Sequence, residues 1–393
     1  MPDEMTEGST HQGAVWSFLP HDRVNDLIER LRDEGFRTIG PRIVDQAIVL
    51  GDLDHSDSLP RGWLDEQEAG HYRLRRDEDA GWFDFVVGPQ SLKPFLLPPR
   101  ETLFQIDRTP DRQWSVTEPR ERDRPLAVIG VRGCDVAALA ILDKVFLDGP
   151  HRDPRYARRR AELFLVGISC RRAAPTCFCH SMDTGPELRG GCDVELREVA
   201  AGFLVRGNTK RGHSIVSALD VEMATAEVVA DSNRRTTRLQ EEMAGRASRR
   251  SRHGAGRWVD RTGLHDRLMQ GLDHEHWKSV AERCLACANC TMVCPTCFCT
   301  TVDDVSDLHN EHVVRQRRWE SCFTTEHSYT VAGPVHPSTA SRYRQWLVHK
   351  LASWEDQFGT TGCVGCGRCI TWCPVGIDVT EEVRYFEART ANG

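Results

Sequence analysis

The chain has 393 residues, a formal net charge of −7 and 16 cysteines. This length is sufficient for two or three domains with apolar cores, so the cysteines are not needed to staple a small scaffold. The acidic balance provides no overall basic surface for nucleic acid. The polar segment Met1–His11 and the lack of any apolar run approaching 18 residues predict a cytoplasmic protein with no membrane span. Local arginine clusters are interpreted as solvated faces or linker, with binding to a partner's acidic surface as the less favoured alternative: Arg158, Arg159, Arg160, Arg246, Arg249, Arg250 and Arg252.

The first part of the chain, residues 1–215, is predicted to form a mixed α/β domain. Two of its apolar runs, Leu126–Val131 and Leu163–Ile168, have the length of buried strands. The segment Asp135–Phe146 between them has helical periodicity, with Asp135 as the expected N-cap. The strands of such a unit are parallel, and the loops after their carboxyl ends lie at the same edge of the sheet.

Four cysteines fall on these two loops and are therefore expected to converge. The alternative for Cys134 and Cys170 is that they are small buried apolar residues at strand ends. That alternative is weaker for the pair that flanks Phe178. Because convergent thiolates in a reducing compartment favour a metal over a disulfide, we expect an additional iron–sulfur cluster held by Cys134, Cys170, Cys177 and Cys179.

The rest of the chain is expected to be helical. Residues 216–277 are polar and arginine-rich and are interpreted as a helical, basic connector, with an exposed stretch from Gly245 to Gly256. Residues 278–393 are predicted to form a mainly α-helical ferredoxin-like domain, in which Ser338–Trp354 has apolar residues at helical spacing. The predicted fold class is therefore α+β.

The last domain contains the cysteine run CxxCxxCxxxCP twice. Bacterial ferredoxins bind 4Fe-4S clusters with this spacing, and the fourth cysteine of each run ordinarily serves the other cluster. Four-cysteine zinc sites use two separated pairs instead. We therefore predict two 4Fe-4S clusters, and electron transfer, from Cys284, Cys287, Cys290, Cys294, Cys363, Cys366, Cys369 and Cys373.

Three further cysteines of this domain have no assigned role. The segment Pro175–Cys179, PTCFC, recurs as Pro295–Cys299, and another cysteine follows in the segment WESC. These thiols could pack beside the clusters, or they could ligate a further cluster with His327 or His336 as its fourth ligand; we favour packing or support of the clusters. Cys192 is the best candidate for a simple free thiol. The three unassigned residues are Cys297, Cys299 and Cys322.

No nucleotide-binding fingerprint is present in the sequence. There is no GxGxxG between a strand and a helix and no P-loop. Flavin and nicotinamide chemistry would then come from another subunit, with a flavin site that lacks a motif as the open alternative.

The cysteine-rich segments resemble one known family over most of the chain, from about Ser91 to the end. They resemble the beta subunits of cytoplasmic sulfhydrogenases, which are NAD(P)-linked nickel–iron hydrogenases, and the corresponding iron–sulfur subunits of anaerobic sulfite reductases. One departure is that the family usually has Gly-Gly-His after its WxSC segment, whereas this chain has Ala332–His336, which weakens a ligand role for His336. The segments that carry the resemblance are Pro98–Phe104, Gly130–Asp135, Gly167–Cys170, Cys177–Cys179, Cys284–Cys299, Arg318–Cys322 and Cys363–Cys369.

The resemblance implies an electron-transfer subunit without a catalytic residue of its own. Such subunits relay electrons between a flavin-bearing, NAD(P)H-binding partner and the catalytic partner, here the small and large subunits of a hydrogenase. The principal alternative is a sulfite reductase in which the electrons reach a sirohaem subunit, and a less favoured one is an iron–sulfur redox sensor. The sequence does not separate hydrogenase from sulfite reductase, because the catalytic metal belongs to another polypeptide.

Overall fold

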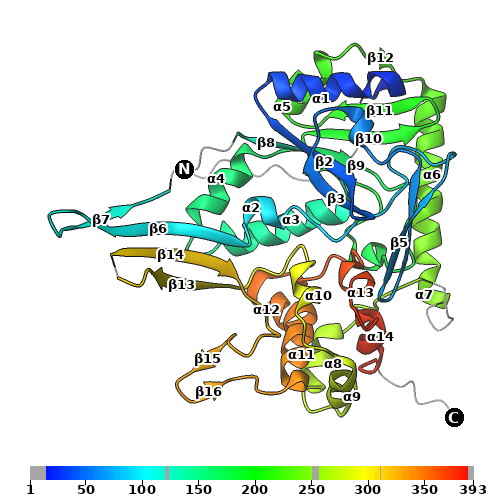
Figure 1. The fold of residues 1–393 in the computed structure, drawn as a ribbon. Helices are drawn as coiled ribbons and strands as arrows, with labels where there is room; N and C mark the ends of the chain where they lie inside the picture. Colours follow the sequence, from blue (N-terminus) through cyan, green and yellow to red (C-terminus); the bar gives the residue numbers. More distant parts are fainter. Residues whose placement is uncertain (1–14, 120–123, 250–255, 310, 388–393) are drawn as a thin grey trace, which may run out of the picture.

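A sheet of eight strands forms the larger part of the fold in the computed structural model, which describes residues 15–119, 124–249, 256–309 and 311–387 (Figure 1). The strand order is β12-β1-β11-β10-β9-β8-β2-β3. Its strands are β1 (Ser17–Pro20), β2 (Arg37–Val44), β3 (Ala47–Asp52), β8 (Leu126–Val131), β9 (Phe164–Ile168), β10 (Val194–Val199), β11 (Gly202–Gly207) and β12 (Glu222–Met223).

The predicted strand–helix–strand unit is confirmed. Strands β8 and β9 are parallel, with Val128 opposite Leu165, and the connection between them contains α3 (Gly133–Phe146) and α4 (Pro154–Glu162). The prediction that Asp135 is the N-cap of this helix is wrong. The cap is Arg132, and the Asp135 carboxylate accepts a 3.4 Å hydrogen bond from the Arg132 amide, as an acidic residue does in a capping box.

Both faces of the large sheet are covered. Ala127 and Ile129 of β8 pack in the core that includes residues of α1 (Val24–Asp33) and α5 (Lys210–Ser217). Val128 and Val131 belong to the opposite core, with residues of α2 (Lys93–Leu96), α3 and α4. Burial on both faces explains why β8 reads as a continuous apolar run rather than an alternating one.

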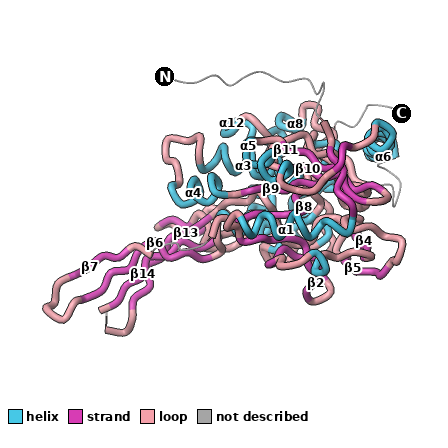
Figure 2. The backbone as a smooth tube through the Cα atoms, turned by 90° about the horizontal axis from the view of Figure 1, so that it is seen from above, coloured by secondary structure: helices cyan, strands magenta, loops and turns pink. Residues whose placement is uncertain are grey.

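A second, four-stranded sheet projects from the body as a long arm (Figures 1 and 2). Strand β6 lies in the predicted first domain and β14 in the predicted last one, yet they pair, with Phe104 opposite Arg315. The domain bounds 1–215, 216–277 and 278–393 stay a prediction. The expected mainly helical character of the last domain is not confirmed, because it also contains strands. The arm consists of β13 (Thr300–Ser306), β14 (His312–Trp319), β6 (Arg100–Arg108) and β7 (Trp114–Thr117).

A further apolar core includes Trp277, Leu347 and Ile370. The helix predicted over Ser338–Trp354 is confirmed, and it contains a π-helical turn, η4 (His349–Ser353), between two α-helical segments. Among the described residues, no helix is both long and apolar enough to cross a bilayer. The other elements are η1 (His21–Arg23), η2 (Ser56–Ser58), β4 (Trp63–Glu68), β5 (His71–Arg76), η3 (Cys179–Met182), α6 (Ala226–Ala244), α7 (Arg246–Arg249), α8 (Leu264–Gln270), α9 (His276–Arg283), α10 (Asn289–Met292), β15 (Tyr329–Thr330), β16 (Gly333–Pro334), α11 (Thr339–Val348), α12 (Trp354–Phe358), α13 (Arg368–Thr371) and α14 (Val379–Arg384).

The prediction that the arginine clusters are solvated is wrong for three members. Arg159 and Arg160 are half-buried; Arg159 donates to the Leu96 carbonyl oxygen at 3.1 Å, and Arg160 pairs with Asp143 at 3.1 Å. Arg246, expected in an exposed connector, is buried because its guanidinium donates to main-chain oxygens of a cysteine-bearing loop. Met1–His11, residues 250–255 of the connector and with them Arg250 and Arg252 lie outside the described residues.

Candidate metal centres

The first cysteine run curls around a cavity. The helix α9 ends with Cys284 as its C-cap. In the loop that follows, Ala286 and Ala288 have φ of 51° and 64°, so each of these two residues is in the left-handed conformation. The Ala286 amide donates to Cys284 Sγ at 3.4 Å. Tyr343 and Trp346 contribute apolar wall to the cavity. Among the described residues five cysteines line it, and Cys369 is one of them. The other four, here called the surface set, are Cys284, Cys287, Cys290 and Cys373, of which Cys287 is exposed.

The second run repeats this geometry with glycines. Gly365 and Gly367 have φ of 64° and 79°, and the Gly365 amide donates to Cys363 Sγ at 3.4 Å. Glycine is required here for a further reason. A Cβ on Gly365 would lie 2.6 Å from the main-chain carbon of Phe178, and one on Gly367 would lie 2.5 Å from the Thr176 carbonyl oxygen. The backbone of the second run therefore packs directly against the backbone of the loop Pro175–Cys179.

The fourth cysteine of each run lies with the first three of the other run. Burial raises the pKa of the Cys284 thiol, and repulsion from Cys373 raises it further. Burial likewise raises the pKa of the Cys369 thiol, and the nearby thiols of Cys294 and Cys290 raise it further. Cys369 therefore lies near Cys294, the fourth cysteine of the first run, and also near Cys290 of the surface set. This is the crossed arrangement expected of a dicluster ferredoxin. The second group, here called the central set, comprises Cys363, Cys366, Cys369 and Cys294.

The four cysteines of the α/β part also lie together. Cys134 is the second residue of α3, and Cys170 follows β9, as the parallel strand order requires. Burial raises the pKa of the Cys177 thiol to about 12, with further contributions from Cys170 and from Cys366 of the central set. Without a metal these thiols are neutral, and a metal would displace their protons. This group, the inner set, comprises Cys134, Cys170, Cys177 and Cys179.

Buried guanidinium groups surround the inner set. Arg132, Arg246 and Arg368 are only 2%, 5% and 3% exposed. Arg368 pairs with Asp135 at 2.8 Å, but Nη1 of Arg132 and Nη1 of Arg368 have no hydrogen-bond partner among the described residues. Buried unpartnered donors are costly, and anionic sulfur would satisfy them. The inner set therefore fits an iron–sulfur cluster, which would supply one-electron transfer there.

Two buried lysines lie close to the central set. Lys350 is 4% exposed, and its Nζ donates to Cys294 Sγ at 3.3 Å, Thr296 Oγ1 at 3.1 Å and the Gly362 carbonyl oxygen at 3.0 Å. Burial alone would lower the pKa of Lys350, but electrostatic interaction with Cys294 and Cys297 raises it well above its usual value. The ammonium is therefore charged, and it would favour the reduced form of a cluster beside it.

Lys93 is the second buried lysine near the central set. Its Nζ donates to the carbonyl oxygens of Thr291 and Met292 at 3.2 and 3.3 Å and lies 3.9 Å from the centre of the Trp319 ring. Burial lowers the pKa of Lys93, and Cys297 opposes that shift. Neither lysine was predicted from the sequence. The sequence signal that could have identified Lys350 is a lysine on the apolar face of a predicted helix. In the structure Lys350 lies in the π-helical turn η4, and such turns are frequent at functional sites.

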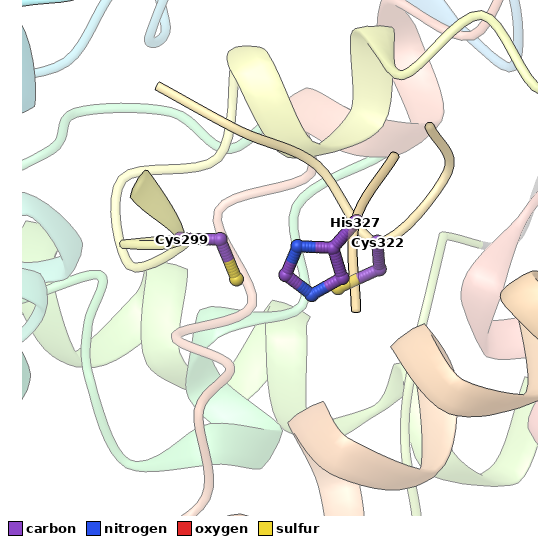
Figure 3. Close-up of side chains that lie close together, drawn as sticks. All are labelled: Cys299, Cys322 and His327. Atoms are coloured by element: carbon purple, nitrogen blue, oxygen red, sulfur yellow. The ribbon is translucent and has the colours of Figure 1, made fainter. Parts of the chain in front are cut away.

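The unassigned cysteines divide into two places. Cys297 hydrogen-bonds with Cys294, which lowers the pKa of Cys294. Cys299 lies instead with Cys322 and His327, and their candidate ligand atoms are all within 4.8 Å of one another (Figure 3). Hydrogen bonding from Cys322 lowers the pKa of Cys299 to about 7. Cys192 is buried in the core, where its Sγ accepts from Asn208 Nδ2 at 3.4 Å, apart from all of these groups.

Two comparisons with known proteins agree with this arrangement. The family described as 4Fe-4S dicluster domain matches residues 283–377. The chain is 35% identical over 296 residues to the sulfhydrogenase 2 subunit beta of Pyrococcus furiosus, and the alignment covers 74% of this chain and 82% of that protein. No solved structure matches the chain. The chain is an iron–sulfur electron-transfer protein, and it belongs to the family of sulfhydrogenase beta subunits.

Proposed function

We propose that the chain relays electrons inside a cytoplasmic, NAD(P)-linked nickel–iron hydrogenase complex. It would connect a flavin-bearing, NAD(P)H-binding subunit with the hydrogenase small and large subunits. In this proposal the surface and central sets ligate two 4Fe-4S clusters and the inner set ligates a third. The chain itself would contribute binding, spacing and electrostatic tuning, and no catalytic residue.

The observation that carries the proposal is the contact between successive sets. Cys366 of the central set lies against the inner set, with its carbonyl oxygen 3.9 Å from Cys177 Sγ. Cys369 of the same set has Cys290 of the surface set as a neighbour, and Cys287 of the surface set is exposed. Three adjoining sets, with exposed Cys287 at one end and half-buried Cys170 at the other, have the order that a path for single electrons requires.

Hydrogenase is favoured over sulfite reductase by the 35% identity to a sulfhydrogenase beta subunit. Delivery of electrons to a sirohaem subunit and a role as a redox sensor have no supporting observation among the described residues. Copurification offers a direct test of the partner. A flavoprotein together with nickel–iron hydrogenase subunits is expected, and a sirohaem protein in their place would contradict the proposal.

The relay is tested by replacing Cys366 with Ser in the assembled complex. Loss of one ligand of the central set should abolish hydrogen turnover that is coupled to NAD(P)H. Turnover with an artificial dye that reaches the hydrogenase subunits directly should persist. Cys192→Ser is the matched control, because Cys192 is buried but belongs to no set. A Cys366→Ser complex that assembles and keeps its coupled turnover would show that electrons do not pass through the central set.

A further inference from the structure

We propose that Cys299, Cys322 and His327 bind a single divalent metal ion, zinc, at a site separate from the three cysteine sets. None of these three residues belongs to the surface, central or inner set. The sequence alone left open a further cluster that also included Cys297. The geometry points instead to one ion and three protein ligands.

The spacing of the three side chains suits one ion. In Figure 3 the Cys299 thiol points toward the His327 ring, and the Cys322 thiol lies beside that ring. Their candidate ligand atoms lie within 4.8 Å of one another. Zinc bonds of about 2.3 Å to sulfur and about 2.0 Å to nitrogen, in tetrahedral geometry, separate neighbouring ligands by roughly 3.5–3.8 Å. A small contraction of side chains would therefore close the site.

Cys297 and His336 do not join this group. Cys297 interacts with Cys294 of the central set and with Lys350. His336, the other histidine considered from the sequence, is absent from the group of atoms within 4.8 Å. A 4Fe-4S cluster ordinarily takes four protein ligands. Only three converge here among the described residues, which leaves the fourth position of a tetrahedral ion to water.

Two β-strands bring the thiols together before any metal binds. Cys299 immediately precedes β13, and Cys322 follows β14 by three residues. Thr300 and Trp319 are the last pair of this ladder, and the Glu320 amide continues it with a 2.9 Å bond to the Cys299 carbonyl oxygen. The ion would thus close the base of the β13–β14 hairpin, and ligands held by a ladder lose little entropy on binding.

The loop that carries His327 is anchored at its start. The buried Ser321 hydroxyl shares a 2.8 Å hydrogen bond with Thr291 and accepts a 3.1 Å bond from the Phe323 amide. Phe323 itself is 3% exposed. These contacts fix Cys322 between two buried residues, whereas His327 is half-buried. The ion would therefore tie the part of the loop that carries His327 to the arm.

The charge of the site also suits a divalent ion. Two thiolates and a neutral imidazole around a divalent cation give no net charge, which limits the cost of half-burial. The ammonium of Lys350 acts electrostatically on both Cys299 and Cys322. A metal site without net charge would not repel the buried Lys350 ammonium.

The test is the zinc content of the full chain, produced with zinc and iron supplied and purified without oxygen. Wild type should contain about one zinc per chain, because three converging ligands define one site. His327→Gln and Cys322→Ser should each lose that zinc while iron and sulfide stay unchanged. His336→Gln is the matched control, since His336 is equally half-buried and nine residues away but outside the group, and it should keep the zinc. Cobalt added in place of zinc should give thiolate-to-cobalt absorption in wild type and His336→Gln only.

Three results would overturn the proposal. The first is wild type without stoichiometric zinc. The second is His327→Gln with its zinc retained. The third is a loss of about four iron per chain in Cys322→Ser, which would indicate a cluster in place of a single ion. The unchanged iron content expected of the variants also reports that they have folded and kept their clusters.

Discussion

The main-chain amide of Phe178 donates a 2.8 Å hydrogen bond to the carbonyl oxygen of Gly365. Phe178 lies between two cysteines of the inner set, and Gly365 lies between two of the central set. The hydroxyls of Thr176 and Thr371 form a second bridge, at 2.9 Å, between the same two parts of the chain. Because main-chain atoms make the first contact, the spacing of the two sets is set by the backbone rather than by flexible side chains.

The first prediction concerns the number of clusters. If all three sets are occupied, protein purified without oxygen should contain about twelve iron and twelve sulfide per chain. Cys177→Ser combined with Cys179→Ser should reduce both to about eight, since the surface and central sets are untouched. Cys192→Ser serves as the control and should keep the wild-type content. Iron that is unchanged in the double variant would mean that the inner thiols are structural.

The second prediction concerns the packing of Gly365. Its φ is 64°, and an added Cβ would lie 2.6 Å from Phe178. Gly359 has nearly the same φ, 66°, but nothing within 4 Å of an added Cβ. Gly359→Ala should therefore lose only about 1 kcal/mol of stability to the left-handed conformation. Gly365→Ala should lose roughly 1–3 kcal/mol more to the clash.

Thermal midpoints of the two variants, measured on cluster-loaded protein without oxygen, check this difference. Gly365→Ala should melt at a lower temperature than Gly359→Ala. Equal midpoints would show that the two loops are not packed against each other as closely as the Phe178 to Gly365 contact requires.

Local patterns in the sequence were sufficient to predict the parts that depend on local spacing. The two cysteine runs and the strand–helix–strand unit each lie within a short segment, and the parallel strand order follows from the length of the crossover. The position of Cys134 beside Cys170 was therefore predictable, and the structure has both in one apolar cluster. The crossed grouping of Cys294 and Cys373 was expected from ferredoxin spacing alone.

Contacts between distant segments were not predictable in the same way. The pairing of β6 with β14 joins residues about 200 positions apart, and no local signal marks it. Lys93 and Lys350 are buried near Cys294 only because three separate segments meet there. Arg246 was interpreted as solvated because a basic run usually is, whereas the acceptors that bury it lie on a loop some 70 residues earlier.

The third prediction concerns the charge of Lys350. A buried cation beside a cluster stabilises the extra electron of the reduced form, so Lys350→Met should lower the reduction potential of the central cluster. A unit charge at this range corresponds to a shift on the order of 100 mV. Methionine keeps the length and apolar character of the side chain and limits any loss of packing. A redox titration followed by electron paramagnetic resonance measures the shift.

Lys144→Met is the control for this measurement. Lys144 is exposed, and its Nζ donates to the Phe358 carbonyl oxygen at 2.9 Å rather than to any thiol. The control should leave all potentials as in wild type. A Lys350→Met protein with full iron content and unshifted potentials would remove the tuning role assigned to this ammonium.

The last prediction is that the isolated chain does not react with nicotinamide nucleotides. Its sequence has no GxGxxG fingerprint, and the proposed function places flavin and nicotinamide on a partner subunit. The full chain with its clusters should therefore be bleached by a strong chemical reductant but not by NADH or NADPH. Addition of the flavoprotein subunit should restore bleaching by the nucleotide, because a flavin can accept a hydride and pass on single electrons. Rapid bleaching by NADH or NADPH in chain shown to be free of flavin would contradict this division of roles and would require a nucleotide site within the chain itself.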